Sequence, residues 1–245
     1  MYQFFVPDES VGQERITICG ADANHIGNVL RMKPGERIRV SAASGRSFFC
    51  RIETISRESV TASIEEQDTL GTEFAHRVYL FQGLPKGDKM ELIVQKAVEL
   101  GACEVIPVAM KHCVVKLDEK KAKSRTARWQ AIAESAAKQA KRTVIPRVRE
   151  PVGWEKALIE AQKLPVVLVP YENERGLSAT REQIRAIPEG ADIGVMIGPE
   201  GGFAGEEIAA ARERGMHLIS LGRRILRTET AGLAALSMLI YELDI

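Results

Sequence analysis

Short stretches in which apolar and polar residues alternate occupy the first part of the chain, up to residue 64. Alternation of this kind, interrupted by Gly and Ser, is typical of short, half-buried β-strands. We expect strands at residues 2–6, 15–18, 36–41, 46–55 and 59–64. A short helix after Asp22 and a polar linker over residues 65–72 complete this region. Because many short strands follow closely on one another, the pattern predicts a small β-barrel.

From residue 76 onward, apolar runs typical of buried strands alternate with stretches of helical periodicity. The expected strands cover residues 77–82, 103–108, 165–170, 192–197 and 217–221. The expected helices cover residues 88–100, 118–141, 206–214 and 229–241. Asp88 and Glu91 have the spacing of a capping box at the start of the first helix. The alternation predicts an α/β domain with a parallel sheet, so the expected domains are residues 1–72 and 73–245.

The last expected helix is apolar on almost every side, which indicates burial by its own domain or by a second subunit. Apolar residues make up 45% of the 245-residue chain, which excludes a disordered protein. No apolar run is long enough for a membrane span, and the N-terminal residues lack the pattern of a secretory signal. The scattered cysteines and histidines have no metal-ligand spacing, so we expect a cytoplasmic protein with reduced thiols and no metal.

Basic residues outnumber acidic ones by 12 to 3 between residues 111 and 149, although the whole chain has a net charge of only +1. Such an excess attracts polyanions, and a solvated helix face is the alternative interpretation. On the helix expected over residues 118–141, Arg128, Lys138 and Arg142 fall on one flank beside an apolar stripe. That flank can follow a row of phosphates while the stripe packs on the sheet.

Three loops in the last third of the chain follow expected strands of one sheet, at residues 170–173, 198–203 and 222–231. In open α/β sheets, ligands bind at these carboxyl ends. The second loop contains three glycines, which leave backbone groups accessible to a ligand, and a tight strand–helix turn is the alternative. In the third loop, three arginines surround the apolar Ile225 and Leu226, a mixture that suits a pocket with apolar walls and a cationic rim. The glycines occur too late for a Rossmann fingerprint, and no P-loop spacing is present.

Motifs occur in a fixed order along the chain. Within the loops just described they are Gly198-Pro199-Glu200-Gly201-Gly202, Leu221-Gly222, Ile225-Leu226-Arg227 and Glu229-Thr230-Ala231. Further upstream they are His25 with Val29-Leu30-Arg31, Gly83-Leu84-Pro85-Lys86-Gly87-Asp88-Lys89, Gln95-Lys96-Ala97, Glu99-Leu100-Gly101, and Gln139 with Arg142 before Pro146. Together these motifs, over nearly the whole chain, resemble the ribosomal RNA small-subunit methyltransferase E family of the SPOUT superfamily.

This resemblance implies a PUA-like β-barrel followed by an α/β trefoil-knot domain that binds S-adenosylmethionine. It also implies a homodimer that methylates N3 of one uridine in the decoding region of 16S ribosomal RNA, with the assembled small subunit as substrate. One departure is visible, because Gln3 stands where family members often carry Arg. An RNA contact by that Arg is therefore in doubt.

Site residues follow from the loops and the resemblance. We expect the cofactor to contact Val169, Pro170, Ile197, Gly198, Pro199, Gly201, Gly202, Leu221, Gly222, Ile225, Leu226, Thr230 and Ala231. We expect RNA to contact Arg31, Lys33, Lys86, Lys89, Arg128, Lys138 and Arg142.

The chemistry of uracil N3 indicates the catalytic residues. N3 becomes a good nucleophile only when its proton leaves, which needs a base or a cation that stabilises the uracil anion. Arg227 is the candidate cation, because its charge does not depend on pH. Glu200 and Glu229 are candidate carboxylates, for proton removal or for favouring the sulfonium, and helix capping is the alternative for Glu229. Two other functions stay open: a noncatalytic RNA-binding protein on this fold, and a nucleotide-dependent oxidoreductase.

Overall fold

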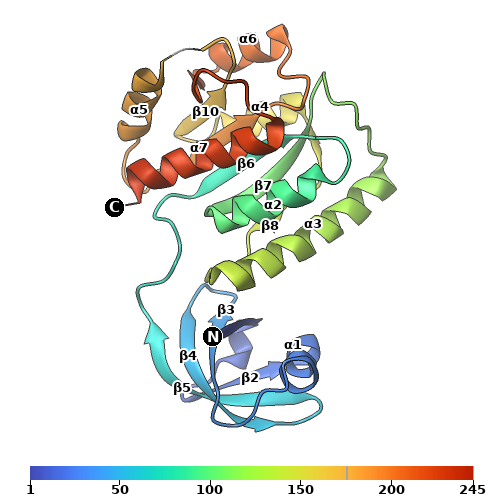
Figure 1. Cartoon of the computed structure of the whole chain (residues 1–245), viewed down its shortest axis with the longest axis vertical. Helices are drawn as coiled ribbons and strands as arrows, with labels where there is room; N and C mark the ends of the chain where they lie inside the picture. Colours follow the sequence, from blue (N-terminus) through green and yellow to red (C-terminus); the bar gives the residue numbers. More distant parts are fainter. Residues whose placement is uncertain (175, 245) are drawn as a thin grey trace. The chain divides into compact units, whose positions relative to one another are not determined.

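The structure, a computed structural model, describes residues 1–174 and 176–244. The chain forms two compact units (Figure 1). The first unit contains residues 1–73 and 137–145, and the second contains residues 74–136 and 146–245. The return of residues 137–145 to the first unit was not predicted, because this segment lies inside a helix and the loop after it, where no composition change marks a boundary.

The first unit is built on a five-stranded sheet with the order β1-β3-β4-β5-β2. Its strands are β1 (Tyr2–Val6), β2 (Arg15–Cys19), β3 (Arg37–Ala42), β4 (Ser47–Ile55) and β5 (Ser59–Asp68). Strand β1 runs parallel to β3, whereas the other neighbours are antiparallel. Alternate apolar side chains such as Ile16, Ile38 and Ile52 form one buried cluster, which is why the alternating pattern produced these strands.

The prediction of a linker over residues 65–72 is wrong for residues 65–68, which belong to a strand. Strand β5 continues to Asp68, which pairs in register with Ser47 of β4. Glu65 accepts hydrogen bonds from Arg37 and Arg51 across the sheet, so a polar sequence is held in strand geometry by cross-strand ion pairs. Between β2 and β3 lie α1 (Gly20–Asn24) and a π-helical turn η2 (His25–Val29), and a 3-10 turn η1 (Asp8–Ser10) follows β1.

The second unit contains a parallel sheet with the order β12-β10-β11-β6-β7-β8, in which β9 also pairs with β7. The strands are β6 (Val78–Gly83), β7 (Ala102–Ala109), β8 (Arg147–Val148), β9 (Val152–Gly153), β10 (Val166–Pro170), β11 (Ile193–Ile197) and β12 (His217–Ile219). The parallel sheet expected from the sequence is therefore present. Its central strands are apolar on both faces because helices cover both.

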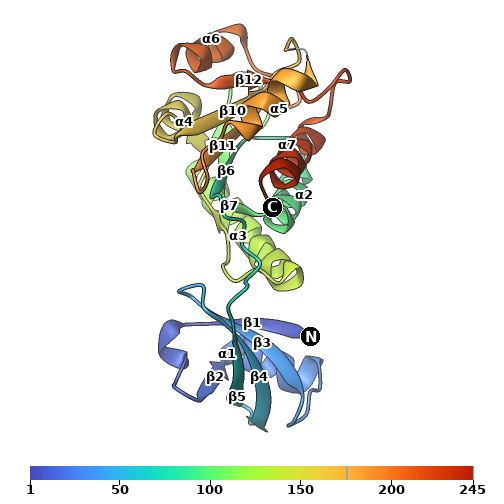
Figure 2. The same cartoon turned by 90° about the vertical axis from the view of Figure 1, so that its left-hand side faces the viewer.

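Helices cover this sheet on two sides (Figure 2). They are α2 (Lys89–Glu99), α3 (Glu119–Ala140), α4 (Trp154–Ala161), α5 (Leu177–Arg185), α6 (Gly205–Glu213) and α7 (Thr228–Leu243). Helices α4 and α6 share one apolar cluster with Phe81, Val167 and Met196 of the sheet. On the other face, α7 packs against β6, β11 and α2. Helices α4 and α5 were not predicted, because each is short and buries only two or three side chains.

Two local expectations differ from the structure. Asp88 does precede α2, but its side chain makes no capping hydrogen bond, and Glu91 pairs with Arg128 instead, so the predicted capping box is wrong. Helix α7 buries one face, including Leu236 and Leu239, whereas Tyr241 is 78% exposed, so burial within one chain is less complete than its apolar sequence indicated. Within the described ranges, no helix has the length and apolar character needed to cross a membrane.

Candidate active site

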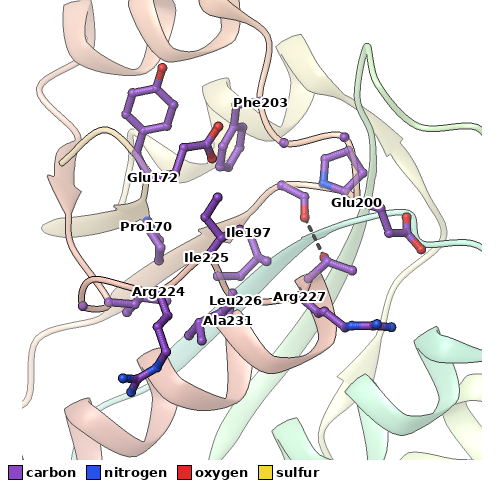
Figure 3. A pocket seen from close by; sticks show the side chains of 18 of the residues that line it. Pro170, Glu172, Ile197, Glu200, Phe203, Arg224, Ile225, Leu226, Arg227 and Ala231 are labelled. Atoms are coloured by element: carbon purple, nitrogen blue, oxygen red, sulfur yellow. Dashed lines mark hydrogen bonds between the residues drawn. The ribbon is translucent and has the colours of Figure 1, made fainter.

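The three predicted loops meet at one edge of the parallel sheet. Because β12, β10 and β11 are neighbours in the sheet, the loops that follow them lie side by side. Together with the start of α7 they line a pocket of about 540 Å³ (Figure 3). The carboxyl ends of adjacent parallel strands therefore create the cavity, as expected for an open α/β sheet.

The Gly-rich loop after β11 depends on the absence of side chains. A Cβ on Gly201 would lie 2.9 Å from the Cβ of His112, too close for an ordinary contact. Gly202 has a φ of +69°, a conformation that strains other residues. The Nδ1 atom of His112 lies 3.1 Å and 3.2 Å from the carbonyl oxygens of Gly201 and Gly202, so it donates a hydrogen bond that fixes the loop from outside.

Two buried hydrogen bonds connect this loop to α7 and to the sheet. The Thr228 hydroxyl donates to the carbonyl oxygen of Gly198 over 2.6 Å and accepts a hydrogen bond from Gln82 Nε2 over 2.8 Å. Figure 3 shows the first of these bonds. Both side chains are buried, and sequence reasoning missed them. The available signal was a single Gln at the end of the otherwise apolar strand β6.

Most residues expected at the cofactor line the pocket. They are Pro170, Ile197, Gly198, Pro199, Gly201, Gly202, Leu221, Gly222, Ile225, Leu226 and Ala231. Val169 is fully buried inside β10 and Thr230 is exposed on α7, and neither lines the cavity. Tyr171, Glu172 and Phe203 also line it but were not expected as site residues. The binding role of the expected residues stays a prediction.

Carboxylates surround a lysine at the polar end of the pocket. Lys89 Nζ lies 2.9 Å from Glu200 Oε1 and 3.5 Å from Glu229 Oε2. Burial acts to raise the pKa of Glu200, but hydrogen bonds from Lys89 and from the Lys86 N–H outweigh burial, so this pKa lies below its ordinary value. The hydrogen bond to Glu200 in turn raises the pKa of Lys89. Lys89 and Glu200 therefore form an ion pair at neutral pH, and Lys89, expected at RNA, lines the pocket.

The arginines of the third loop have surroundings that differ from those of Lys89. Arg223, Arg224 and Arg227 are exposed, and none of them forms an ion pair with any residue in the described part of the chain. Arg227 lies directly before α7, with extended backbone. Figure 3 shows the side chains of Arg224 and Arg227 leaving the loop toward different sides of the pocket. The loop thus presents uncompensated positive charge around apolar walls.

The other predicted RNA contacts fall into two groups. Arg31, Lys33 and Lys86 are exposed, as expected. Arg128 pairs with Glu91, and Lys138 pairs with Asp22. These two side chains therefore have acidic partners that the sequence did not reveal.

The structure contradicts the prediction for Arg142. Arg142 is only 4% exposed and pairs with Glu73, so the expectation that it presents its charge to solvent on a helix flank is wrong. It follows the end of α3, and its N–H bonds to the carbonyl oxygen of Ala137. Gln3 is also buried, and its Nε2 donates to the Arg142 carbonyl oxygen and to Ser41 Oγ. The side chain at position 3 thus stabilises the interior of the first unit.

Relatives of the chain identify its family. Residues 72–240 match the sequence model of an RNA methyltransferase domain, and residues 18–65 match that of an RNA methyltransferase PUA domain. The chain is 38% identical over 232 residues to ribosomal RNA small subunit methyltransferase E of Bacillus subtilis. The aligned residues cover 94% of this chain and 91% of the relative. The chain belongs to the ribosomal RNA small subunit methyltransferase E family. The family protein of Mesomycoplasma hyopneumoniae is 32% identical over 245 residues, which cover 99% of this chain and 100% of that protein.

Solved structures of similar proteins agree in fold. The enzyme from Neisseria gonorrhoeae, bound to S-adenosyl methionine, matches with a TM-score of 0.84 and 32% identity, over 98% of this chain and 97% of that one. A methyltransferase from Legionella pneumophila in complex with the same cofactor matches with a TM-score of 0.83 and 31% identity, again over 98% and 97%. The expected α/β domain with a parallel sheet and the expected N-terminal PUA domain are confirmed.

Proposed function

We propose that this protein transfers a methyl group from S-adenosylmethionine to N3 of one uridine in the decoding region of 16S ribosomal RNA. We further propose that it acts in the cytoplasm, as a homodimer, on the assembled small subunit. The observation that carries the proposal is the pocket at the ends of β10, β11 and β12, in a chain of the methyltransferase E family. The exposed Tyr241 on the largely apolar helix α7 supports a second subunit there.

The pocket residues fit the parts of this cofactor. S-adenosylmethionine, when bound, supplies an electrophilic methyl group on a sulfonium. The apolar side chains of Ile197 and Leu226 suit its adenine ring, and the glycines at 201 and 202 allow close approach of the backbone. The carboxylates of Glu172 and Glu200 line the cavity and favour a cationic ligand. The nearby Arg224 provides a partner for its carboxylate.

The same residues suit methyl transfer to an imide nitrogen. We assign to Arg227 the stabilisation of the uracil anion, because this residue lines the pocket and its guanidinium has no acidic partner among the described residues. Glu200 and Glu229 remain the candidate carboxylates for proton removal. Because its pKa is lowered, Glu200 is a weak proton acceptor, which places more of the rate acceleration on Arg227 and on alignment of the methyl group with N3.

Access to the target requires an unpaired base. N3 lies on the Watson–Crick edge, so the enzyme must meet the uridine unpaired or draw it from its stack. The exposed Arg31, Lys33 and Lys86 are the proposed phosphate contacts that orient the RNA. Arg128 and Lys138 contribute only if they leave their acidic partners.

The test is a methyl-transfer assay with the labelled methyl donor and small subunits that lack the modification. We expect labelling of intact subunits, weaker labelling of free 16S RNA, and a product methylated at N3 of one uridine. No labelling would support a noncatalytic RNA-binding protein, and labelling of another atom would contradict the uracil-N3 assignment. Calorimetric titration with NADH is the control, and tight binding would support an oxidoreductase instead.

A further inference from the structure

Lys89 connects three elements that surround the pocket. It is the first residue of α2, Glu200 lies in the loop after β11, and Glu229 lies in the first turn of α7. The ammonium group donates to Glu200 Oε1 over 2.9 Å and forms an ion pair with Glu229 Oε2 over 3.5 Å. Glu200 Oε1 also accepts the Lys86 N–H over 3.0 Å, so the first residue of α2 and the loop before it both donate to this carboxylate.

The charge of this cluster differs from that of a phosphate contact. Two carboxylates and one ammonium carry a net charge of −1, so the cluster presents no excess positive charge to RNA. Three residues earlier, Lys86 is exposed, and its side chain forms no ion pair with any described residue. The two lysines of one motif therefore have different surroundings, and only Lys86 is suited to a polyanion.

Loss of Lys89 would leave the two carboxylates without their common partner. Glu229 Oε2 is buried and makes no hydrogen bond to a described residue, so the ammonium is its neighbouring countercharge. A carboxylate oxygen buried without compensation is costly, and two neighbouring carboxylates repel each other. Glu200 belongs to the same loop as Gly201 and Gly202, so its displacement would move the backbone that lines the pocket.

We propose that Lys89 is a positioning residue, which holds Glu200 and Glu229 together so that the loop after β11 and the start of α7 keep the geometry needed for methyl transfer. This inference rests on the proposed function. Lys89 acts through the two carboxylates and does not contact RNA phosphate. Its conservative replacement by Arg keeps a charge that can bridge them, whereas replacement by Met keeps only the length of the side chain.

The experiment compares Lys89→Met, Lys89→Arg and Lys86→Met with the wild type in methyl transfer to unmodified small subunits. For K89M we expect kcat to fall by about 100-fold with little change in KM for the subunit, because misplaced groups slow the chemical step. K89R should recover to within about three-fold of the wild type. K86M should instead raise KM and reduce the slope of log affinity against log salt concentration by about one, the signature of a lost phosphate contact.

Lys96→Met is the matched control, because Lys96 lies on the same helix and pairs with Glu99, which is outside the pocket. It should leave kcat unchanged. The single variant E200Q and the double variant K89M/E200Q are measured as well, and the double variant should lose less than the two single losses multiplied together, because Lys89 acts through Glu200. The double variant also keeps the proposal testable if K89M alone fails to fold.

Three results would overturn the proposal: K89M with unchanged kcat and a reduced salt slope, K89R as slow as K89M, or fully additive losses in the double variant. An inactive wild type would instead contradict the proposed function. In that case, calorimetric titration of S-adenosylmethionine into K89M and the wild type still tests Lys89. Weaker binding by K89M would support its role in holding the loop, and equal binding would overturn it.

Discussion

Arginines in the two units of this protein show how much the partner of a charge matters. In the first unit, Arg39 and Arg142 are buried and bind Asp68 and Glu73. In the second unit, Arg224 and Arg227 line a pocket, are exposed, and have no acidic partner within the described residues. The same side chain therefore stabilises the fold in one place and is available to a ligand in the other. Counting charges along the sequence does not distinguish these cases.

Removing an unpaired arginine should affect chemistry and not folding. For Arg227→Met we expect turnover to fall by about 10³-fold, because a preorganised charge at the reacting base is lost. Cofactor affinity, measured by calorimetry, should stay within about three-fold, since the side chain is assigned to the base and not to the cofactor. Arg212→Met, which breaks an exposed ion pair with Glu174, is the control. Unchanged turnover in R227M would remove its assigned role.

Adding a side chain to the Gly-rich loop should close the cofactor site. Gly201→Val places a branched side chain against His112, and we expect cofactor affinity to fall by about 100-fold as the loop is pushed into the pocket. Gly205→Val is the matched control, since no atom of the residues that the structure describes lies within 4 Å of a Cβ at that position. Calorimetry measures both variants. Normal binding by G201V would show that this loop is not part of the cofactor site.

Removing a paired arginine should affect folding. For Arg142→Met we expect the free energy of unfolding to fall by about 2 kcal/mol, because Glu73 loses the partner of its carboxylate in a largely buried site. Denaturant titration gives this value, and Arg224→Met, which breaks no ion pair with a described residue, should stay within about 0.5 kcal/mol of the wild type. If R142M unfolds like the wild type and binds RNA with a smaller salt dependence, the assignment of Arg142 to the fold is wrong.

Substitution of Arg31 should have the smallest effect on stability. It also separates the effect of this residue on stability from its effect on RNA binding. Arg31 is exposed and has a φ of +54°, a conformation that glycine adopts without strain. Arg31→Gly should therefore raise the melting temperature slightly, by the equivalent of about 0.5 kcal/mol, while it weakens RNA binding. Arg31→Ala keeps the strain and loses the charge. A loss of stability in R31G would contradict this account of the backbone.

Much of the fold could be predicted, because strands and long helices leave a local pattern. The positions of β10, β11 and β12 followed from short apolar runs, and their parallel order then brought three loops together. Partners distant in sequence left no such pattern. Glu73 and Arg142 are 69 positions apart, and Gln82 and Thr228 are 146 apart. Their pairing depends on tertiary packing, so helical geometry alone placed Arg142 on an exposed flank.

The crystal structure of the protein soaked with S-adenosylmethionine tests the central claim most directly. The account predicts the cofactor in the pocket at the ends of β10, β11 and β12, against the backbone of Gly201 and Gly202, with its methyl group accessible to a base near Arg227. A structure in which the cofactor binds elsewhere, or in which its methyl group faces a wall that no base can reach, would contradict it.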